Sequence, residues 1–235
     1  MKRFSVLAAG CAAVAIGLGV AAYQAAADSG GTISGTVKYD GPAPAQKKVE
    51  VTKDKEVCGL KPHFEEDLIV AGNGGIANAV VVLKDAKGTA KPIEVKFDQK
   101  GCDYQPHVLA FPAGSTVDIM NDDGILHNIH TYSKVNPAFN MAQPKFKKEI
   151  KQKIDKPEVI KVACDAHGWM HGWWYVTDTP YYAVTDANGN FTIKDVPPGT
   201  YTIEVWQEKL GTQDQKVDVK AGATTTSDFT MKPKA

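Results

Sequence analysis

The sequence predicts an all-β protein built from β-sandwiches. Short runs of β-branched and aromatic residues alternate with turn residues, and no stretch keeps a sustained helical period. The composition agrees, because 21 Gly and 13 Pro accompany many Val, Thr and Ile residues. With 235 residues, 43% of them hydrophobic and 23% charged, the chain is long enough for a substantial core. This composition excludes wholesale disorder and a multi-span membrane protein.

The first half of the chain contains four predicted strands. Residues 32–37 form a strand that ends at an Asp-Gly-Pro turn, and residues 78–83 contain the apolar run of a buried strand. Residues 93–97 alternate apolar and charged side chains, as expected of a strand with one face in a core. A further strand, residues 116–120, follows a Pro-Ala-Gly turn.

The second half continues the same pattern. Residues 186–189, Asp-Ala-Asn-Gly, predict a hairpin turn before a strand at 191–193. A Val-Pro-Pro-Gly turn at 196–199 leads into a strand at 201–206. Residues 145–161 carry seven Lys against three acidic residues, which predicts a solvated strand pair or loop, with a docking patch as the alternative.

The N-terminal residues 1–27 have the pattern of an export signal. Lys2 and Arg3 precede an uncharged apolar run, and a small-residue stretch ends at Ala27. We expect cleavage after Ala27 and a periplasmic or otherwise exported protein. Two alternatives keep the protein on a membrane: the apolar run is retained as an anchor, or Cys11 receives a lipid.

The charge balance restricts the partners. Basic and acidic residues number 27 each, so the net charge is zero. A nucleic-acid-binding protein held by overall basicity is therefore not expected. A membrane partner is expected only if the leader is retained or lipidated.

One segment carries a metal-binding constellation. Cys164, His167 and Met170 place a thiolate, an imidazole and a thioether within seven residues, and His127 follows an upstream strand. Two His, one Cys and a weak Met form the ligand set of a blue-copper electron-transfer site. The soft sulfur ligands favour Cu(I) and the imidazoles also suit Cu(II), so we expect one copper ion that cycles between these states.

Residues 102–176 resemble a cupredoxin. The strand that begins at Phe111 resembles the one that precedes the first copper ligand in that family, and the Cys-x2-His-x2-Met spacing is that of amicyanin-type members. The resemblance implies that Asn128, which follows the first ligand, braces the cysteine loop. It also implies the copper ligands, with the methionine axial: His127, Cys164, His167 and Met170.

Two other histidines lie near this motif. His130 lies three residues after His127, so on a strand it faces the opposite side and is a surface or outer-sphere residue. His171 is the alternative fourth ligand to Met170. That exchange would make the site more nitrogen-rich and redder.

The remaining cysteines of the exported part predict a disulfide. An oxidising compartment pairs cysteines, and with Cys164 assigned to the metal, Cys58 and Cys102 pair most simply with each other. The alternative is a second metal site with His63 and His107, since each lies five residues after its cysteine.

The end of the chain carries a second resemblance. Residues 183–201 resemble a carboxypeptidase regulatory-like (transthyretin-like) domain, and two strands typical of its beginning precede the copper motif. The resemblance implies a Greek-key cupredoxin sandwich, residues 91–177, inserted in or adjacent to a small transthyretin-like sandwich. The latter is discontinuous and comprises residues 28–90 and 178–235.

These predictions define an expected function. The chain is expected to be a periplasmic electron carrier rather than an enzyme, with a cytochrome c or a dehydrogenase or reductase as its redox partner. One alternative is copper binding or handling without electron shuttling. Another is a catalytic red-copper site similar to nitrosocyanin, which requires that Met170 does not bind. The six scattered His do not supply the additional His-rich sites of multicopper enzymes.

Overall fold

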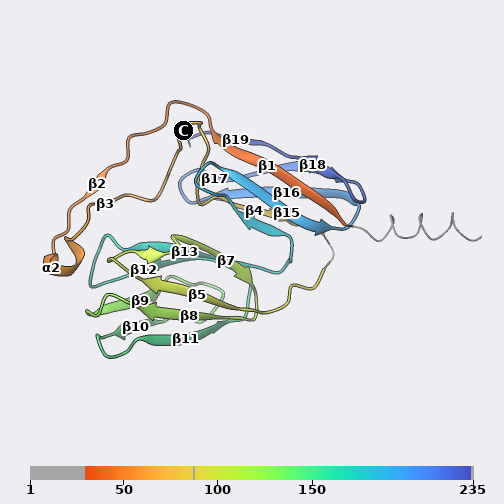
Figure 1. Ribbon diagram of the computed structural model, residues 1–235. Coiled ribbons are helices and arrows are strands. Elements are labelled where there is room, and N and C mark those ends of the chain that lie inside the picture. The colour runs from red at the N-terminus through yellow and green to blue at the C-terminus, as the bar shows by residue number, and fades with distance from the viewer. Residues whose placement is uncertain (1–29, 87, 234–235) are drawn as a thin grey trace, which may run out of the picture.

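The computed structural model describes residues 30–86 and 88–233 and is all-β, as the sequence predicts (Figure 1). Apart from the short helix α2 (Lys55–Cys58), the regular elements described are strands, which form two stacked β-sandwiches. The predicted export signal, residues 1–27, lies outside the described residues. Within the described ranges, no helix has the length and apolar character needed to span a membrane.

The first sandwich, the upper one in Figure 1, combines the beginning and the end of the chain. One sheet consists of β1 (Gly31–Tyr39), β15 (Asn190–Val196), β18 (Thr224–Thr226) and β19 (Phe229–Met231). The other sheet consists of β14 (Tyr182–Val184), β4 (Val80–Leu83), β16 (Gly199–Gln207) and β17 (Gly211–Val219).

The second sandwich is formed by the middle of the chain. Its larger sheet has the order β10 (Asn140–Gln143), β9 (His127–Thr131), β12 (Glu158–Ala163), β13 (His171–Thr177) and β7 (Val108–Pro112). The facing sheet has the order β11 (Glu149–Ile154), β8 (Ser115–Asn121), β5 (Glu94–Gln99) and β6 (Tyr104–Gln105). The lysine-rich residues 145–161 include β11 and the start of β12.

The chain leaves the first sandwich and returns to it at adjacent strands. β4 and β14 pair antiparallel, with Val82 opposite Tyr182, although all of β5 to β13 lies between them in the sequence. The two ends of the intervening segment are therefore close together, which is the geometry that permits a folded unit within a loop.

β4 is buried on both faces, and this explains its apolar sequence. Val81 and Leu83 belong to the core of the first sandwich. Val80 and Val82 point the other way and pack with Tyr175 and other residues of the second sandwich. One face of β4 therefore belongs to the core of the first sandwich, and its other face belongs to the contact between the two sandwiches.

A segment between β1 and β4 extends along the second sandwich. This segment, which we call the strap (residues 44–67), contains β2 (Lys48–Val49), α2 and β3 (His63–Phe64), and β2 pairs only with β3. The predicted disulfide between Cys58 and Cys102 is present, with an S–S distance of 2.01 Å, and ties the strap to the second sandwich. Both sulfurs are bonded, so these cysteines cannot act as metal ligands.

The predicted hairpin at residues 186–189 is wrong in its pairing. The turn itself forms: Asp186 Oδ1 accepts from the backbone N–H groups of Asn188 and Asn190, both at 2.8 Å. However, β14 pairs with β4 and β15 pairs with β1, so the flanking strands belong to different sheets. The turn residues reverse the chain locally, whereas the burial of each strand decides which sheet it joins.

The contact between the sandwiches is expected to contribute to stability. Val82→Ala removes two buried methyl groups at this contact, and we expect the free energy of unfolding to fall by about 1–3 kcal/mol. Chemical denaturation followed by tryptophan fluorescence measures the change. The matched control is Lys194→Ala, at an exposed position of β15, which should change stability by less than about 0.5 kcal/mol. Equal effects of both variants would contradict this assignment.

Candidate metal centre

Three of the four predicted ligands, His127, Cys164 and His167, come together in the second sandwich, and Met170 lies on the same loop as two of them. His127 begins β9, and Cys164, His167 and Met170 lie on the loop between β12 and β13. Two backbone hydrogen bonds hold this loop in a compact turn: Cys164 N–H donates to Met170 O at 3.0 Å, and Met170 N–H donates to His167 O at 2.9 Å. Cys164, His167 and Met170, which are close in sequence, are therefore also close in space.

Three donor atoms form a triangle of suitable size for one metal ion. Cys164 Sγ lies 3.9 Å from His127 Nδ1 and 3.7 Å from His167 Nδ1, and the two nitrogens are 3.0 Å apart. An ion about 2.0 Å from each nitrogen and about 2.3 Å from sulfur places nitrogen and sulfur about 3.8 Å apart in a trigonal arrangement. Both imidazoles are fully buried, and Cys164 and Met170 are 2% exposed. The residues present fit a metal ion with nitrogen and sulfur ligands.

A carboxylate orients each imidazole. His127 Nε2 lies 2.9 Å from Asp123 Oδ2, and His167 Nε2 lies 2.8 Å from Asp54 Oδ2. Each carboxylate accepts the Nε2 proton and thereby directs Nδ1 toward the sulfur of Cys164, as carboxylates commonly do for metal-binding histidines. The sequence reasoning missed both carboxylates. Asp123 stands four residues before His127, whereas no sequence signal connects Asp54 with His167.

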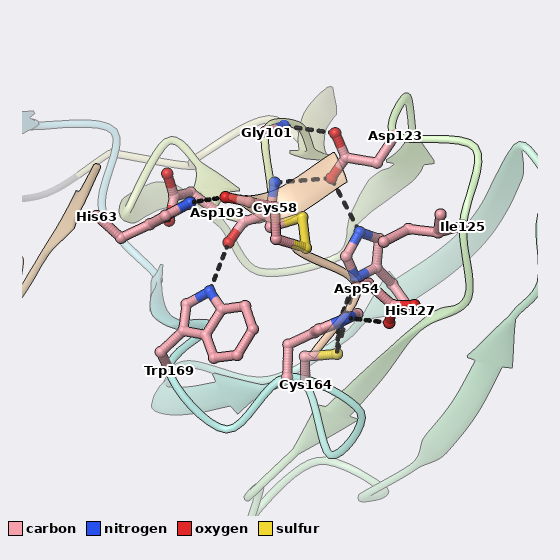
Figure 2. The surroundings of a disulfide bond; sticks show 12 residues. Asp54, Cys58, His63, Gly101, Asp103, Asp123, Ile125, His127, Cys164 and Trp169 are labelled. Carbon is pink, nitrogen blue, oxygen red and sulfur yellow. Dashed lines mark hydrogen bonds and ion pairs between the residues drawn. A yellow bond between two sulfur atoms is a disulfide. The ribbon is translucent and has the colours of Figure 1, made fainter. Parts of the chain in front are cut away.

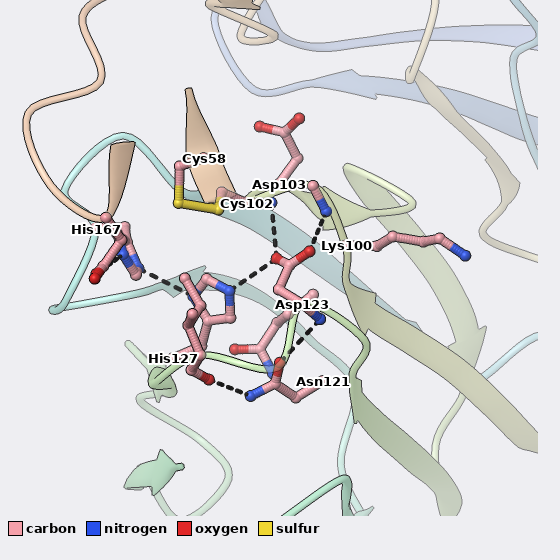
Figure 3. Close-up of polar contacts among 12 residues, drawn as sticks. Cys58, Lys100, Cys102, Asp103, Asn121, Asp123, His127 and His167 are labelled. Atoms are coloured by element: carbon pink, nitrogen blue, oxygen red, sulfur yellow. Dashed lines mark hydrogen bonds and ion pairs between the residues drawn. A yellow bond between two sulfur atoms is a disulfide. The ribbon is translucent and has the colours of Figure 1, made fainter. Parts of the chain in front are cut away.

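The loop that contains Cys102 holds these carboxylates in place. The N–H groups of Gly101 and Cys102 donate to Asp123 at 2.5 and 2.8 Å (Figures 2 and 3). Cys102 is also bonded to Cys58, four residues after Asp54. One crosslinked loop therefore fixes Asp123 directly and Asp54 through the strap.

Asn128 braces the cysteine loop, as the family resemblance implies. Its Oδ1 atom accepts from the Asp165 and Ala166 N–H groups at 2.7 and 3.1 Å, and lies 3.3 Å from Cys164 Sγ. Asn128 Nδ2 donates to Asn140 Oδ1 at 2.8 Å, so β10 holds the amide in turn. The position of the sulfur is thus fixed by hydrogen bonds as well as by the backbone.

The protein shifts the pKa values of two donor groups in the absence of a metal. Burial raises the pKa of the Cys164 thiol, but the imidazoles of His127 and His167 beside the sulfur outweigh it and lower this pKa to about 6. Burial lowers the pKa of His127, but Asp123 and Cys164 outweigh it and raise this pKa to about 9. The metal-free centre therefore holds a thiolate beside a protonated imidazole, and metal binding must displace that proton.

The other two histidines of the prediction lie outside this donor set. His130 Nδ1 contacts Asp165 Oδ1 at 3.0 Å, and its ring stacks on Tyr132 with a centroid distance of 4.3 Å. His171 Nε2 contacts Asp67 Oδ1 at 2.6 Å. The group of donors around Cys164 contains neither of them.

Comparison with known proteins identifies the class of one domain. Residues 175–232 match the family described as the carboxypeptidase regulatory-like domain. Rhamnogalacturonate lyase A of Emericella nidulans is 36% identical over 56 residues, which is 24% of this chain and 11% of the lyase. A putative rhamnogalacturonase of Neurospora crassa is 39% identical over 54 residues, 23% of this chain and 10% of that protein. The chain therefore spans about a tenth of these relatives.

Parts of this chain are similar to solved structures, with TM-scores below 0.5. A copper-containing nitrite reductase from Thermus scotoductus matches with a TM-score of 0.35 and 22% identity, over 42% of this chain and 25% of that chain. A purple cupredoxin from Nitrosopumilus maritimus matches with a TM-score of 0.31 and 23% identity, over 35% of this chain and 99% of that chain. A Cu(I) form of an amicyanin mutant matches with a TM-score of 0.33 and 17% identity, over 41% of this chain and 98% of that chain.

The low pKa of Cys164 is directly measurable in the metal-free protein. We expect the ultraviolet thiolate absorption to appear with a midpoint near pH 6, because the imidazoles stabilise the charged sulfur. His127→Phe removes one of these donors and should raise the midpoint. Cys164→Ser is the control and should abolish the transition, since Cys164 is the one free cysteine among the described residues. A midpoint of 8 or above, that of an ordinary cysteine, would contradict the geometry.

Proposed function

We propose that this chain is an exported type 1 copper protein that carries single electrons between redox partners. The observation that carries the proposal is the buried triangle of Cys164 Sγ and the Nδ1 atoms of His127 and His167, with Met170 on the same loop. Two imidazoles, one thiolate and a thioether are the donors of blue-copper electron-transfer sites.

The residues support electron transfer more than catalysis. Bound copper would supply one-electron chemistry by alternating between Cu(I) and Cu(II). Asp54, Asp123 and Asn128 hold the imidazoles and the cysteine loop in fixed positions, so the donor atoms need little rearrangement when the charge of the site changes. The donor residues are buried, which leaves little room for a substrate at the metal.

The contacts of His171 favour the blue-copper site over the red-copper alternative. Its Nε2 atom contacts Asp67, and its Nδ1–H donates to Trp169 O at 3.2 Å. Both ring nitrogens thus have partners away from Cys164, whereas Met170 is buried in the same cluster as Cys164. We therefore favour Met170 as the fourth ligand. Copper handling without electron transfer has no comparable observation in its favour.

The disulfide supports an oxidising compartment. Cys58 and Cys102 are bonded, and such bonds persist mainly in exported proteins. Together with the leader predicted at residues 1–27, this supports the periplasm as the location. We propose a redox protein of the same compartment, such as a cytochrome c or a dehydrogenase or reductase, as the partner.

Visible and electron paramagnetic resonance spectra of the Cu(II) protein test this function. We expect an intense blue thiolate-to-copper band with narrow hyperfine splitting, and reversible reduction with the metal retained. Cys164→Ser should abolish the band, because it deletes the anionic sulfur ligand. Met170→Leu should retain copper and shift the potential, because the thioether is a weak ligand. A band that persists without Cys164, or loss of copper on reduction, would refute the proposal.

The contact between Asp54 and His167 makes a second prediction. Asp54→Ala should weaken Cu(II) binding by about 10–100-fold, because His167 loses the carboxylate that orients its ring. A competition titration against a chelator of known affinity measures the change. Glu56→Ala, two residues further along the strap and exposed, is the matched control and should bind copper normally. Equal affinities of the two variants would show that Asp54 does not position the ligand.

A further inference from the structure

A second cluster of metal-binding side chains lies where the strap meets both sandwiches. His107 precedes β7, His171 begins β13, and Glu208 follows β16. One donor atom from each of these residues lies within 4.8 Å of the other two. Asp67, at the end of the strap, contacts His171 at 2.6 Å. The donor set around Cys164 contains none of these residues.

His107 has one ring nitrogen that the protein leaves without a hydrogen bond. Its Nε2 atom contacts Glu208, whose other carboxylate oxygen accepts from Trp173 Nε1 at 2.6 Å. Its Nδ1 atom is buried and has no hydrogen-bond partner, and the nearest carboxylate oxygen, Glu66 Oε2, lies 3.5 Å away. His107 is only 5% exposed, so a buried polar atom remains unsatisfied. A carboxylate on one nitrogen and an open second nitrogen is the arrangement of a metal-binding histidine.

The Nε2 atom of His171 contacts Asp67, which lines the same cavity as His107. The Nδ1 atom of His171 must carry the proton, because Trp169 O can only accept. Nε2 therefore faces a carboxylate oxygen of Asp67, a contact that requires a proton or a metal ion. The His107 and His171 rings are 5.3 Å apart.

Gly172 is necessary for this approach of the two histidines. The His107 carbonyl accepts a hydrogen bond from Trp173 N–H at 2.8 Å. A Cβ atom at position 172 would lie 2.8 Å from the same carbonyl oxygen, which is too close. The backbone thus holds His107 against the strand that begins with His171.

A cavity gives an ion access to this region. It has a volume of about 390 Å³ and is lined by His107 and His171 together with Glu66 and Asp67 of the strap. Three carboxylates surround the two imidazoles, those of Glu66, Asp67 and Glu208. Asp67 also pairs with Lys209 at 2.6 Å, so the local charge with neutral imidazoles matches that of a divalent cation.

We propose that His107, His171 and Asp67, with Glu66 beside them, bind a divalent transition-metal ion such as Zn²⁺. Imidazole and carboxylate donors suit Zn²⁺ and similar ions, and Glu208 orients the His107 ring. The ion ties the strap to the second sandwich, and Glu208 connects it to the first. In the metal-free protein, burial lowers the pKa of His107 but Glu208 and Glu66 raise it to about 9, so a proton takes the place of the cation.

Zn²⁺ and Co²⁺ binding to the Cys164→Ser protein tests the proposal independently of the copper function. We expect one equivalent of Zn²⁺ to bind in calorimetry, and Co²⁺ to give visible ligand-field bands without thiolate charge transfer. Adding His107→Ala should weaken Zn²⁺ binding about tenfold or more. His130→Ala, a partly exposed histidine paired with Asp165, is the matched control and should leave binding unchanged.

Asp67→Asn keeps the shape of the side chain but removes its charge. It tests Zn²⁺ binding at this cluster if the buried His107→Ala variant fails to fold. We expect Zn²⁺ to raise the melting temperature of the Cys164→Ser protein, and this increase to disappear when Asp67→Asn is added. Absence of Zn²⁺ binding to Cys164→Ser would overturn the proposal. Unchanged binding in the variants of His107 and Asp67 would also overturn it, because the ion would then lie at His127 and His167 or on the surface.

Discussion

The crosslinked loop at Cys102 is the constraint on which the metal centre depends. Its backbone N–H groups hold Asp123, and its disulfide holds the strap that carries Asp54. These carboxylates in turn hold the two imidazoles. Trp169 of the metal-binding loop donates to the carbonyl of Cys102 at 3.1 Å, so the loop also contacts the segment that supplies Cys164 (Figure 2). The donor geometry is therefore set largely by residues that bind no metal.

The position of the strap follows from the way the two sandwiches are connected. β1 and β4 belong to different sheets of the first sandwich, and the chain between them could have crossed by a short loop. It instead runs along the second sandwich, where Asp54 contacts His167, Cys58 is bonded to Cys102, and His63 contacts Asp103. The strap has little hydrophobic core of its own, so the disulfide and these polar contacts hold it in place. The position of the strap thus depends on the sandwich whose candidate metal ligands it orients.

The sequence predicted the elements better than their partners. Runs of strand-forming residues next to turns located β1 and β8, and the alternation of apolar and charged residues located β5, because burial on one face of a strand leaves a local pattern. The pairing of the strands around residues 186–189 could not be read in the same way, since turn chemistry is local and sheet membership is not. The disulfide followed from counting cysteines on the expectation that the chain is exported.

In the candidate site, too, local features were predictable from the sequence and long-range contacts were not. Cys164, His167 and Met170 were recognisable because a single loop carries their spacing, and His127 because it follows a strand and precedes Asn128. Asp54 was not predictable, because it lies 113 residues before His167 and meets it only through the folded strap. A sequence pattern finds ligands that share a loop, whereas the groups that orient them come from anywhere in the fold.

All six histidines of the chain contact a carboxylate, so such a contact alone does not identify a metal ligand. The pairs are His63–Asp103, His107–Glu208, His127–Asp123, His130–Asp165, His167–Asp54 and His171–Asp67. The surroundings of the second ring nitrogen distinguish the candidate metal ligands from the other histidines. In His63 it contacts the Cys58 carbonyl at 2.8 Å, and the imidazole is saturated by protein. In His127 and His167 it faces the other imidazole and the sulfur, where a metal ion is the partner that satisfies all three atoms. In His107 it is buried without a hydrogen bond, with Glu66 Oε2 3.5 Å away, and this makes the second cluster a candidate site rather than another saturated imidazole.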